Sequence, residues 1–424
     1  MTEPIILQMS RDGNDNTYLQ IRKAPGCGGD DILMPFNCDP AALPSLATYS
    51  DAKAHGQQLL RSLMHSHAQV KTVFESAFSL GPDACRPIYL ELKSLPSAEI
   101  FCWEALCNDN GEFVALDKRW PVARVAGGRL NTREVEKYQP PLKMLVVLSA
   151  LGLDARGEWS AIYGAVERAR EDGLPIELHV GIGQESLQKI VDELSPRPNL
   201  HLFALTSMVD LIRRVDKVQP HLLHFFCHGN VSLNKPRLEI ATFNDQETSS
   251  IEVTLNDLIT SPAVRNSWLT VLNCCKSGSG TRDLQSLCEG LVNGGVNAAI
   301  GMREDVSVIE AAVFSDNFYS SLLTNLQQTL QSLQNDQDTQ FEWSSIMSEP
   351  RKALNSMPNS SAISAWTRPV IYVQPDKFRL RWAIADSPAK RAHDRTIQEL
   401  LALLTADERA SFKAELQALR AERP

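Results

Sequence analysis

The 424-residue sequence contains no apolar run that approaches the ~20 residues a helix needs to cross a bilayer. Its amino-terminal stretch also lacks the basic start, the long apolar segment and the small-residue cleavage site of a secretory signal peptide. No segment recurs with a fixed period, which argues against a repeat architecture. These absences predict a protein that has no membrane partner and resides in the cytoplasm.

Basic residues are not in excess, because 42 lysines and arginines stand against 51 acidic residues and give a net charge of -9. A chain with this balance has no excess of positive charge to bind a nucleic-acid backbone, so we expect no nucleic-acid partner. The acidic surplus favours basic partners or substrates, although net charge is a weak guide to partner identity.

Cysteine occurs nine times, an odd number, at scattered positions. Cys27 and Cys38 lie close together, as do Cys102 and Cys107, but neither pair has the spacing of a zinc knuckle. This pattern is typical of reduced thiols in a cytoplasm and argues against a disulfide framework.

Strands and helices are expected to alternate from residue 143 onward. Short apolar runs predict buried strands at 143–148, 176–180, 200–203, 221–227, 268–272 and 296–300. Helical patterns between them include 185–194, 208–215 and 284–292. Strands separated by helices form a mostly parallel sheet that is covered on both faces. The active sites of such sheets lie at the carboxyl ends of the strands.

The sequence before this region is mixed and rich in turns. Its expected elements are a helix at 52–80 and strands at 87–92, 100–106 and 113–116. We therefore divide the chain into a mixed α+β amino-terminal segment at 1–137, a main α/β domain at 138–376 and a helical tail at 386–424.

The sequence after the main helices is polar. Residues 325–360 are rich in Gln, Asn, Ser and Asp, which predicts a helical extension that grades into an exposed insertion, and a strand at 369–373 closes the domain. Within the tail, Thr405 to Glu408 form a capping-box pattern that begins a second helix. Two such helices cannot bury a core alone, so the tail must dock on the main body or on a partner.

Two predicted strand ends carry groups that suit nucleophilic catalysis. One apolar strand is followed by His228 and Gly229, and the other by Cys274 and Cys275, which enter a Ser/Gly loop. A nucleophilic thiol needs a nearby base, and imidazole titrates near neutral pH. Glycine after the histidine permits close approach of backbone to a substrate.

Other interpretations of these residues are open. A lone histidine at a strand end is more often a satisfied polar residue than a catalyst, and a buried cysteine is more often a small hydrophobe. A zinc site from Cys227, His228, Cys274 and Cys275 is conceivable, but adjacent ligands on stiff strands cannot easily surround a tetrahedral ion.

The two motifs resemble those of the CHAT family of proteases, in the caspase and separase clan. His228-Gly229 resembles the family's His-Gly motif, and Leu-Asn-Cys-Cys-Lys-Ser-Gly at 272–278 resembles its Leu-Ser-Ala-Cys-Glu-Thr-Gly motif. Cys275 follows His228 by 47 residues, which suits the ~50 residues of the clan. Further similarity lies at 103–106, 120–124 and 294–300.

The resemblance implies a caspase-like, mostly parallel sheet flanked by helices, with the mixed α+β segment before it and the short helical tail after it. It also implies a cysteine endopeptidase, with Cys275 as the nucleophile and His228 as the acid/base. The backbone N–H groups of Gly229 and Cys275 would form the oxyanion hole. Such a reaction on a protein substrate requires no metal and no organic cofactor.

The chain departs from the family pattern where substrate specificity would be determined. Glu304 and Asp305 stand where a tryptophan and a proline are common, and Asn273 replaces a serine. By analogy with the clan, Glu304, Asp305 or Asp154 would attract a basic residue before the scissile bond, whereas Arg303 would select an acidic one. All four could instead be solvated loop charges.

The resemblance also suggests a biological setting. CHAT proteins often act in bacterial defence or stress systems, where a second signal releases the protease. A regulatory protein or a second copy of the chain would then bind the tail at 386–424. The rival class is a catalytically silent adaptor that acts through this tail, and a small-molecule hydrolase is a third option.

Overall fold

The computed structural model describes residues 3–12, 14, 16–25, 32–92, 96–126, 135–149, 152–183, 199–232, 235–242, 250–274, 283–333, 338–357 and 365–383. The expected helix at 185–194, the tail at 386–424 and Cys275 lie outside these ranges, so the predictions made for them remain predictions.

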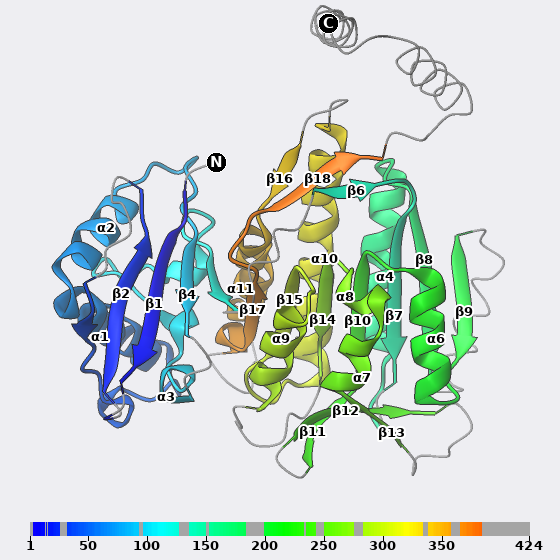
Figure 1. Cartoon of the computed structure of the whole chain (residues 1–424), viewed down its shortest axis with the longest axis horizontal. Helices are drawn as coiled ribbons and strands as arrows, with labels where there is room; N and C mark the ends of the chain where they lie inside the picture. The colour runs from blue at the N-terminus through cyan, green and yellow to red at the C-terminus, as the bar shows by residue number, and fades with distance from the viewer. Residues whose placement is uncertain are drawn as a thin grey trace, which may run out of the picture.

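One twelve-stranded sheet organises the molecule, in the order β3-β2-β1-β4-β5-β17-β15-β14-β10-β7-β8-β9 (Figure 1). Neighbouring strands are parallel except along β3-β2-β1 and between β15 and β17. The strands are β1 (Ile5–Arg11), β2 (Thr17–Lys23), β3 (Met34–Pro35), β4 (Ile88–Glu91), β5 (Val122–Val125), β7 (Leu142–Leu148), β8 (Ile176–Ile182), β9 (Leu200–Ala204), β10 (Leu222–Phe226), β14 (Leu269–Leu272), β15 (Ala298–Met302) and β17 (Pro369–Val373).

Two small sheets accompany the large one, in the orders β11-β12-β13 and β16-β18-β6. Figure 1 shows them beyond opposite ends of the large sheet's strands. Their strands are β6 (Glu136–Tyr138), β11 (His228–Ser232), β12 (Lys235–Ala241), β13 (Ser250–Thr254), β16 (Thr339–Phe341) and β18 (Phe378–Trp382).

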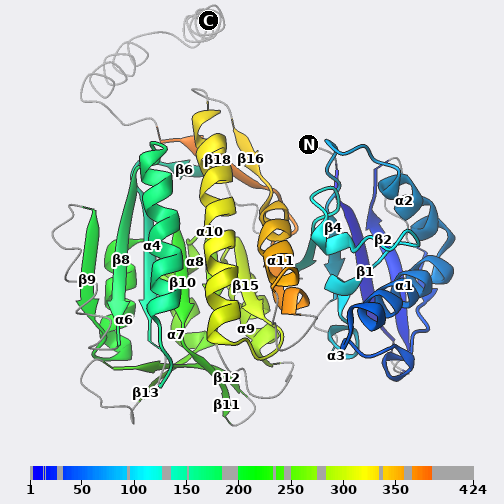
Figure 2. The ribbon, with the colours of Figure 1, turned by 180° about the vertical axis from the view of Figure 1, so that it is seen from behind.

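Helices cover both faces of the main sheet. Figure 2 shows α4 (Arg156–Glu171) and α10 (Val308–Gln331) side by side over one face, and Figure 1 shows α6 to α9 over the other. The remaining helices are α1 (Tyr49–Ser66), α2 (Ala68–Phe78), α3 (Pro96–Glu99), α6 (Met208–Val218), α7 (Leu255–Thr260), α8 (Pro262–Arg265), α9 (Asp283–Asn293), α11 (Ser348–Asn355), and the 3-10 turns η1 (Pro40–Ala42), η2 (Trp103–Ala105), η3 (Val114–Leu116), η4 (Trp343–Met347) and η5 (Ala365–Thr367). Within the described ranges, none of the helices combines the length and apolar character that a bilayer span needs.

The predicted α/β class, a mostly parallel sheet flanked by helices, is confirmed. The strands are recognisable from their sequence because both of their faces are buried. All five residues of β10, for example, are buried, since its alternate side chains enter two hydrophobic clusters on opposite faces. The apolar run in the sequence is the direct consequence of this two-sided burial.

Three predictions of local structure are wrong. The runs at 100–106 and 113–116 form the 3-10 turns η2 and η3 rather than strands. A short apolar run shows only that a segment is buried, and it does not distinguish a strand from a compact turn. At 325–360 the predicted helical extension is present as the end of α10, but the described residues that follow are not an exposed insertion, because Trp343, Ile346 and Leu354 lie in the core.

The amino-terminal segment joins the main sheet through β5, which pairs with β17. A buried ion cluster lies on the amino-terminal side of this junction. Arg124 on β5 is fully buried and donates from Nε and Nη2 to the carboxylate of Glu104, at 3.2 and 3.0 Å, and from Nη1 to Glu99. Although burial alone would raise the pKa of Glu104, the charge of Arg124 and neighbouring arginines holds that pKa below its ordinary value.

Replacing Arg124 by alanine should therefore lower the free energy of unfolding by about 3–5 kcal/mol, because two buried carboxylates lose their partner. Urea unfolding would measure the change. Arg61→Ala is the matched control, since Arg61 pairs with Asp109 at the surface, where a pair contributes ~1 kcal/mol or less. Equal effects of the two substitutions would contradict a stabilising role for the buried cluster.

Candidate active site

The carboxyl ends of several strands of the main sheet lie on the same side of the molecule, and the predicted catalytic residues follow these ends. Four neighbouring strands, β7, β10, β14 and β15, are parallel, so their carboxyl ends lie next to one another. The small sheet β11-β12-β13 lies beyond these ends, below the large sheet in Figure 1. A substrate bound there would contact the residues that follow each strand.

The register between β10 and β14 relates the two sequence motifs. Leu222 pairs with Leu269, and each pair up to Phe225 and Leu272 keeps the same offset of 47 residues. Two residues further on, the Sγ atoms of Cys227 and Cys274 lie 3.7 Å apart, again with an offset of 47. His228 and Cys275 have the same separation in the sequence, although Cys275 itself is not described.

His228 begins β11 at the junction of the two sheets and is partly buried. Its partner in the antiparallel pair with β12 is Glu239. Gly229 is buried and pairs with Leu238. Asn230 extends the same strand and donates from Nδ2 to Glu239 at 2.5 Å. The pairing of β11 with β12 therefore begins at His228 and fixes the position of its backbone.

Cys274 points into the fold, where its side chain is 2% exposed. Because its side chain is buried, Cys274 is out of reach of a substrate and is poorly placed to be the nucleophile.

Five cysteines outside the two motifs are unreactive for an electrostatic reason. Burial raises the pKa of Cys38, Cys85, Cys102, Cys107 and Cys288, to about 11 for Cys85 and Cys107. At neutral pH these five groups are therefore thiols, so none of them competes as a reactive thiolate.

A buried polar cluster anchors the segment that leads to the cysteines. The amide of Asn273 donates from Nδ2 to Oε1 of Glu158 at 3.0 Å, to Oγ of Ser315 at 3.1 Å and to the backbone oxygen of Ala311 at 3.2 Å. Ser315 donates to the same Glu158 oxygen. Asn273 follows β14, whereas Glu158 lies on α4 and Ser315 on α10. Three elements thus fix one side chain next to Cys274.

His224 and Tyr319 complete this cluster. Nε2 of His224 lies 3.1 Å from Oε1 of Glu158, an ion-pair distance without hydrogen-bond geometry, and Nδ1 lies 2.9 Å from the Tyr319 hydroxyl. Burial and the charge of Glu158 raise the pKa of Tyr319 well above its ordinary value, so its hydroxyl keeps the proton. Sequence analysis missed Glu158, His224, Ser315 and Tyr319.

The CHAT domain family matches residues 102–373, more than half of the chain. The chain belongs to the CHAT domain family. None of the curated proteins compared with it matches the chain.

Solved structures similar to this CHAT protein come from three kinds of cysteine peptidase or their complexes. The separase–securin complex of Saccharomyces cerevisiae has a TM-score of 0.36 and 13% identity, covering 74% of this chain and 17% of that chain. The Arg-specific cysteine proteinase gingipain R has a TM-score of 0.42 and 10% identity, covering 75% and 70%. The Drosophila initiator caspase Dronc has a TM-score of 0.30 and 9% identity, covering 60% and 94%. The CHAT protein thus spans less than two thirds of the separase chain.

Two of the predicted pocket residues are exposed at the surface of the CHAT protein. Asp154 lies in the loop between β7 and α4, half exposed, and accepts hydrogen bonds from Nε of Arg156 at 2.9 and 2.8 Å. These contacts lower the pKa of Asp154. Asp305 is exposed three residues after β15.

The other two pocket candidates bind each other. Arg303 is largely buried and donates to the backbone oxygen of Phe101 at 3.2 Å and to Glu304 at 3.3 Å. Glu304 also lies 3.6 Å from Nε of Arg368. The charge of Glu304 is thus shared between two arginines, which leaves Asp305 as the more accessible carboxylate after β15.

The zinc interpretation of the motif cysteines gains no support from the described residues. Cys227, His228 and Cys274 do not form a group of potential ligands there, and the group that does exist lies elsewhere in the sheet. Cys227 and Cys274 are not joined by a disulfide bond.

Proposed function

We propose that the CHAT protein is a cysteine endopeptidase with Cys275 as the nucleophile and His228 as the acid/base. The observation that supports this proposal most directly is the register of β10 and β14. A constant offset of 47 residues brings Cys227 against Cys274, and His228 and Cys275 are the next pair with that offset.

The proposed reaction proceeds through a thioester. His228 takes the proton of the Cys275 thiol, and the sulfur attacks the scissile carbonyl carbon. His228 then gives its proton to the leaving amine as the C–N bond breaks. Water, activated by His228, hydrolyses the thioester and restores the thiol. The N–H groups of Gly229 and Cys275 would stabilise the oxyanion in both steps.

The buried cluster around Asn273 suits this chemistry. A nucleophile must be held in a near-attack geometry, and small displacements cost rate. Asn273 lies two residues before Cys275 in the sequence and is bonded to both α4 and α10. Buried hydrogen bonds therefore hold in place the segment that leads to the proposed nucleophile.

The proposal includes control of the protease by a partner in a defence or stress system. An unregulated endopeptidase would harm its host, so we expect low basal activity. The tail at 386–424 is the proposed docking element for a regulatory protein or a second copy. The silent adaptor is the competing function, and retention of His228 and Cys275 argues against it.

Mapping of new protein termini in cells tests the function. Cells that express the wild-type chain should contain new termini that are missing from cells with Cys275→Ala. The adaptor predicts identical termini in both. To detect a protease that is restrained in these cells, the purified proteins are also treated with a thiol-reactive peptide electrophile. Labelling of neither protein at residue 275, together with identical termini, would refute the proposal.

A further inference from the structure

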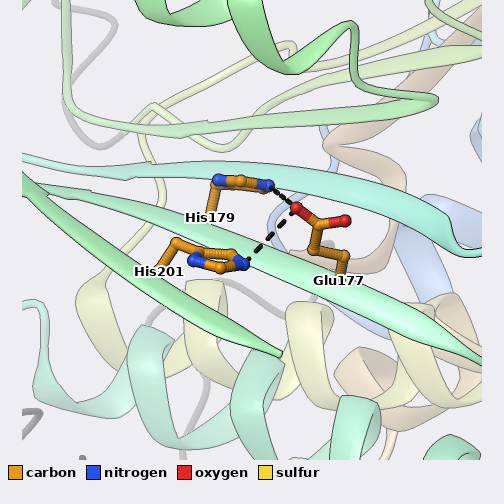
Figure 3. A group of neighbouring side chains, drawn as sticks. All are labelled: Glu177, His179 and His201. Carbon is orange, nitrogen blue, oxygen red and sulfur yellow. Dashed lines mark hydrogen bonds and ion pairs between the residues drawn. The ribbon is translucent and has the colours of Figure 1, made fainter. Parts of the chain in front are cut away.

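Three side chains that the proposed protease does not use converge at the far edge of the sheet. Glu177 and His179 lie on β8, two residues apart and therefore on one face. His201 lies on β9, directly paired with His179 in the parallel register. Figure 3 shows the two imidazole rings side by side, with the Glu177 carboxylate facing both. We call these three residues the edge cluster.

The donor atoms of the edge cluster are close together. Nε2 of His179 lies 2.7 Å from Oε1 of Glu177, and Nε2 of His201 lies 3.4 Å from the same oxygen. The rings stack with their centroids 4.6 Å apart and an interplanar angle of 21°. One ligand atom from each residue can be chosen so that all three lie within 4.8 Å of one another.

One of these separations already matches a tetrahedral zinc ion. Zinc binds imidazole nitrogen and carboxylate oxygen at about 2.0–2.2 Å, so two ligand atoms at a tetrahedral angle are about 3.3–3.5 Å apart. The His201–Glu177 distance has this value, and the His179–Glu177 distance needs a small opening. Two histidines, one glutamate and an open fourth position form a familiar zinc ligand set.

The surroundings leave space for the fourth ligand. A cavity of about 280 Å³ lies over the cluster, between the strands and α6. Its lining includes three cationic residues, Lys143, Arg214 and Lys217. Lys143 donates to the backbone oxygen of Val218 at 3.3 Å, and Arg214 binds Asp210 at 3.1 Å. Two of the three cations are thus directed to other partners.

The cations raise the alternative of an anion site. In such a site both imidazoles would donate outward to the ligand. In the edge cluster, however, the Nε2 atoms of His179 and His201 both face the Glu177 carboxylate. The carboxylate of Glu177 would repel an anion, whereas imidazole nitrogen and carboxylate oxygen are both ligands that zinc accepts, so the donor set favours a metal.

We propose that Glu177, His179 and His201 bind a zinc ion with water as the fourth ligand. The ion joins the edge strand β9 to β8. This inference is independent of the proposed protease activity, because β8 and β9 lie two and three strands beyond β10 in the sheet.

Calorimetric titration of zinc into the untagged full chain tests the site. The titration is done on Cys275→Ala, because a reactive thiolate would add a second zinc site. One equivalent should bind, and His201→Ala or Glu177→Gln should weaken that binding at least ~100-fold, more than the 10–100-fold typical of outer-shell changes. His65→Ala, an exposed histidine on α1, is the matched control and should bind zinc unchanged.

The visible spectrum with cobalt gives a second readout that does not depend on affinity. A tetrahedral site should give intense d–d bands that His201→Ala removes. His201 is about half exposed, so its loss leaves the core intact, and circular dichroism checks the fold. Absence of zinc binding, binding that is unchanged in His201→Ala and Glu177→Gln, or thermal stabilisation by inorganic phosphate but not by zinc would each overturn the proposal.

Discussion

Replacing Cys275 by alanine is expected to abolish peptide cleavage, whereas replacing Cys274 by alanine should leave most of it. Loss of one member of a catalytic unit typically lowers turnover by ~10⁴–10⁶-fold. Cys274 is buried against Cys227, so its truncation removes only a core sulfur and costs roughly 1 kcal/mol of stability. The rates are measured on a substrate identified by the mapping of termini.

Substitution of His228 is a further test of the proposed catalytic pair of His228 and Cys275. His228→Ala should lower turnover as strongly as Cys275→Ala, and the double variant should be no slower than either single one, because residues that act together are non-additive. His65→Ala serves as the surface control. Full activity of Cys275→Ala with loss of activity in Cys274→Ala would refute the assignment of the nucleophile.

Labelling separates the two cysteines without a known substrate. A peptide electrophile should modify residue 275 in wild type and in Cys274→Ala, and nothing in Cys275→Ala. The five described cysteines with raised pKa provide internal controls, since burial keeps them as thiols. Modification of several of these cysteines would indicate a partly unfolded protein.

The sequence predicts the centre of the fold well because the central strands are buried on both faces. β7, β10 and β14 appear as apolar runs for this reason, and their parallel arrangement follows from the alternation of strands with helices. The edge of the sheet is harder to predict. β1 and β2 pair with each other in a mixed, turn-rich segment, where the short apolar run at the start of β1 was not recognised as a strand.

In the candidate site, too, some residues can be predicted from the sequence and others cannot. His228 and Cys275 are recognisable because both follow apolar strands within local motifs. Glu158 and Ser315 lie 115 residues before and 42 residues after their partner Asn273, so only the folded chain brings them together. The departure at Asn273 was the available signal, since a buried amide in place of a serine needs several hydrogen-bond partners.

Glu158→Ala is expected to destabilise the protein and to slow catalysis. The buried carboxylate oxygen accepts from Asn273 and Ser315 and lies beside His224, so its removal should lower the free energy of unfolding by about 3 kcal/mol. Because Asn273 would lose one of its anchors, we also expect kcat to fall by ~10²-fold, with little change in KM. Urea unfolding and steady-state kinetics measure the two effects.

Glu158→Gln and Glu91→Ala separate positioning from stability. Glutamine keeps an acceptor oxygen for Asn273 and Ser315, so Glu158→Gln should recover most of kcat. Glu91 is also buried and binds Arg22 at 2.6 Å, but it lies on β4, four strands away from β14. Glu91→Ala should therefore destabilise the chain without lowering kcat at a temperature where it is folded. If Glu91→Ala lowered kcat as much as Glu158→Ala, the loss would reflect general destabilisation, and Glu158 would have no role in positioning the nucleophile segment.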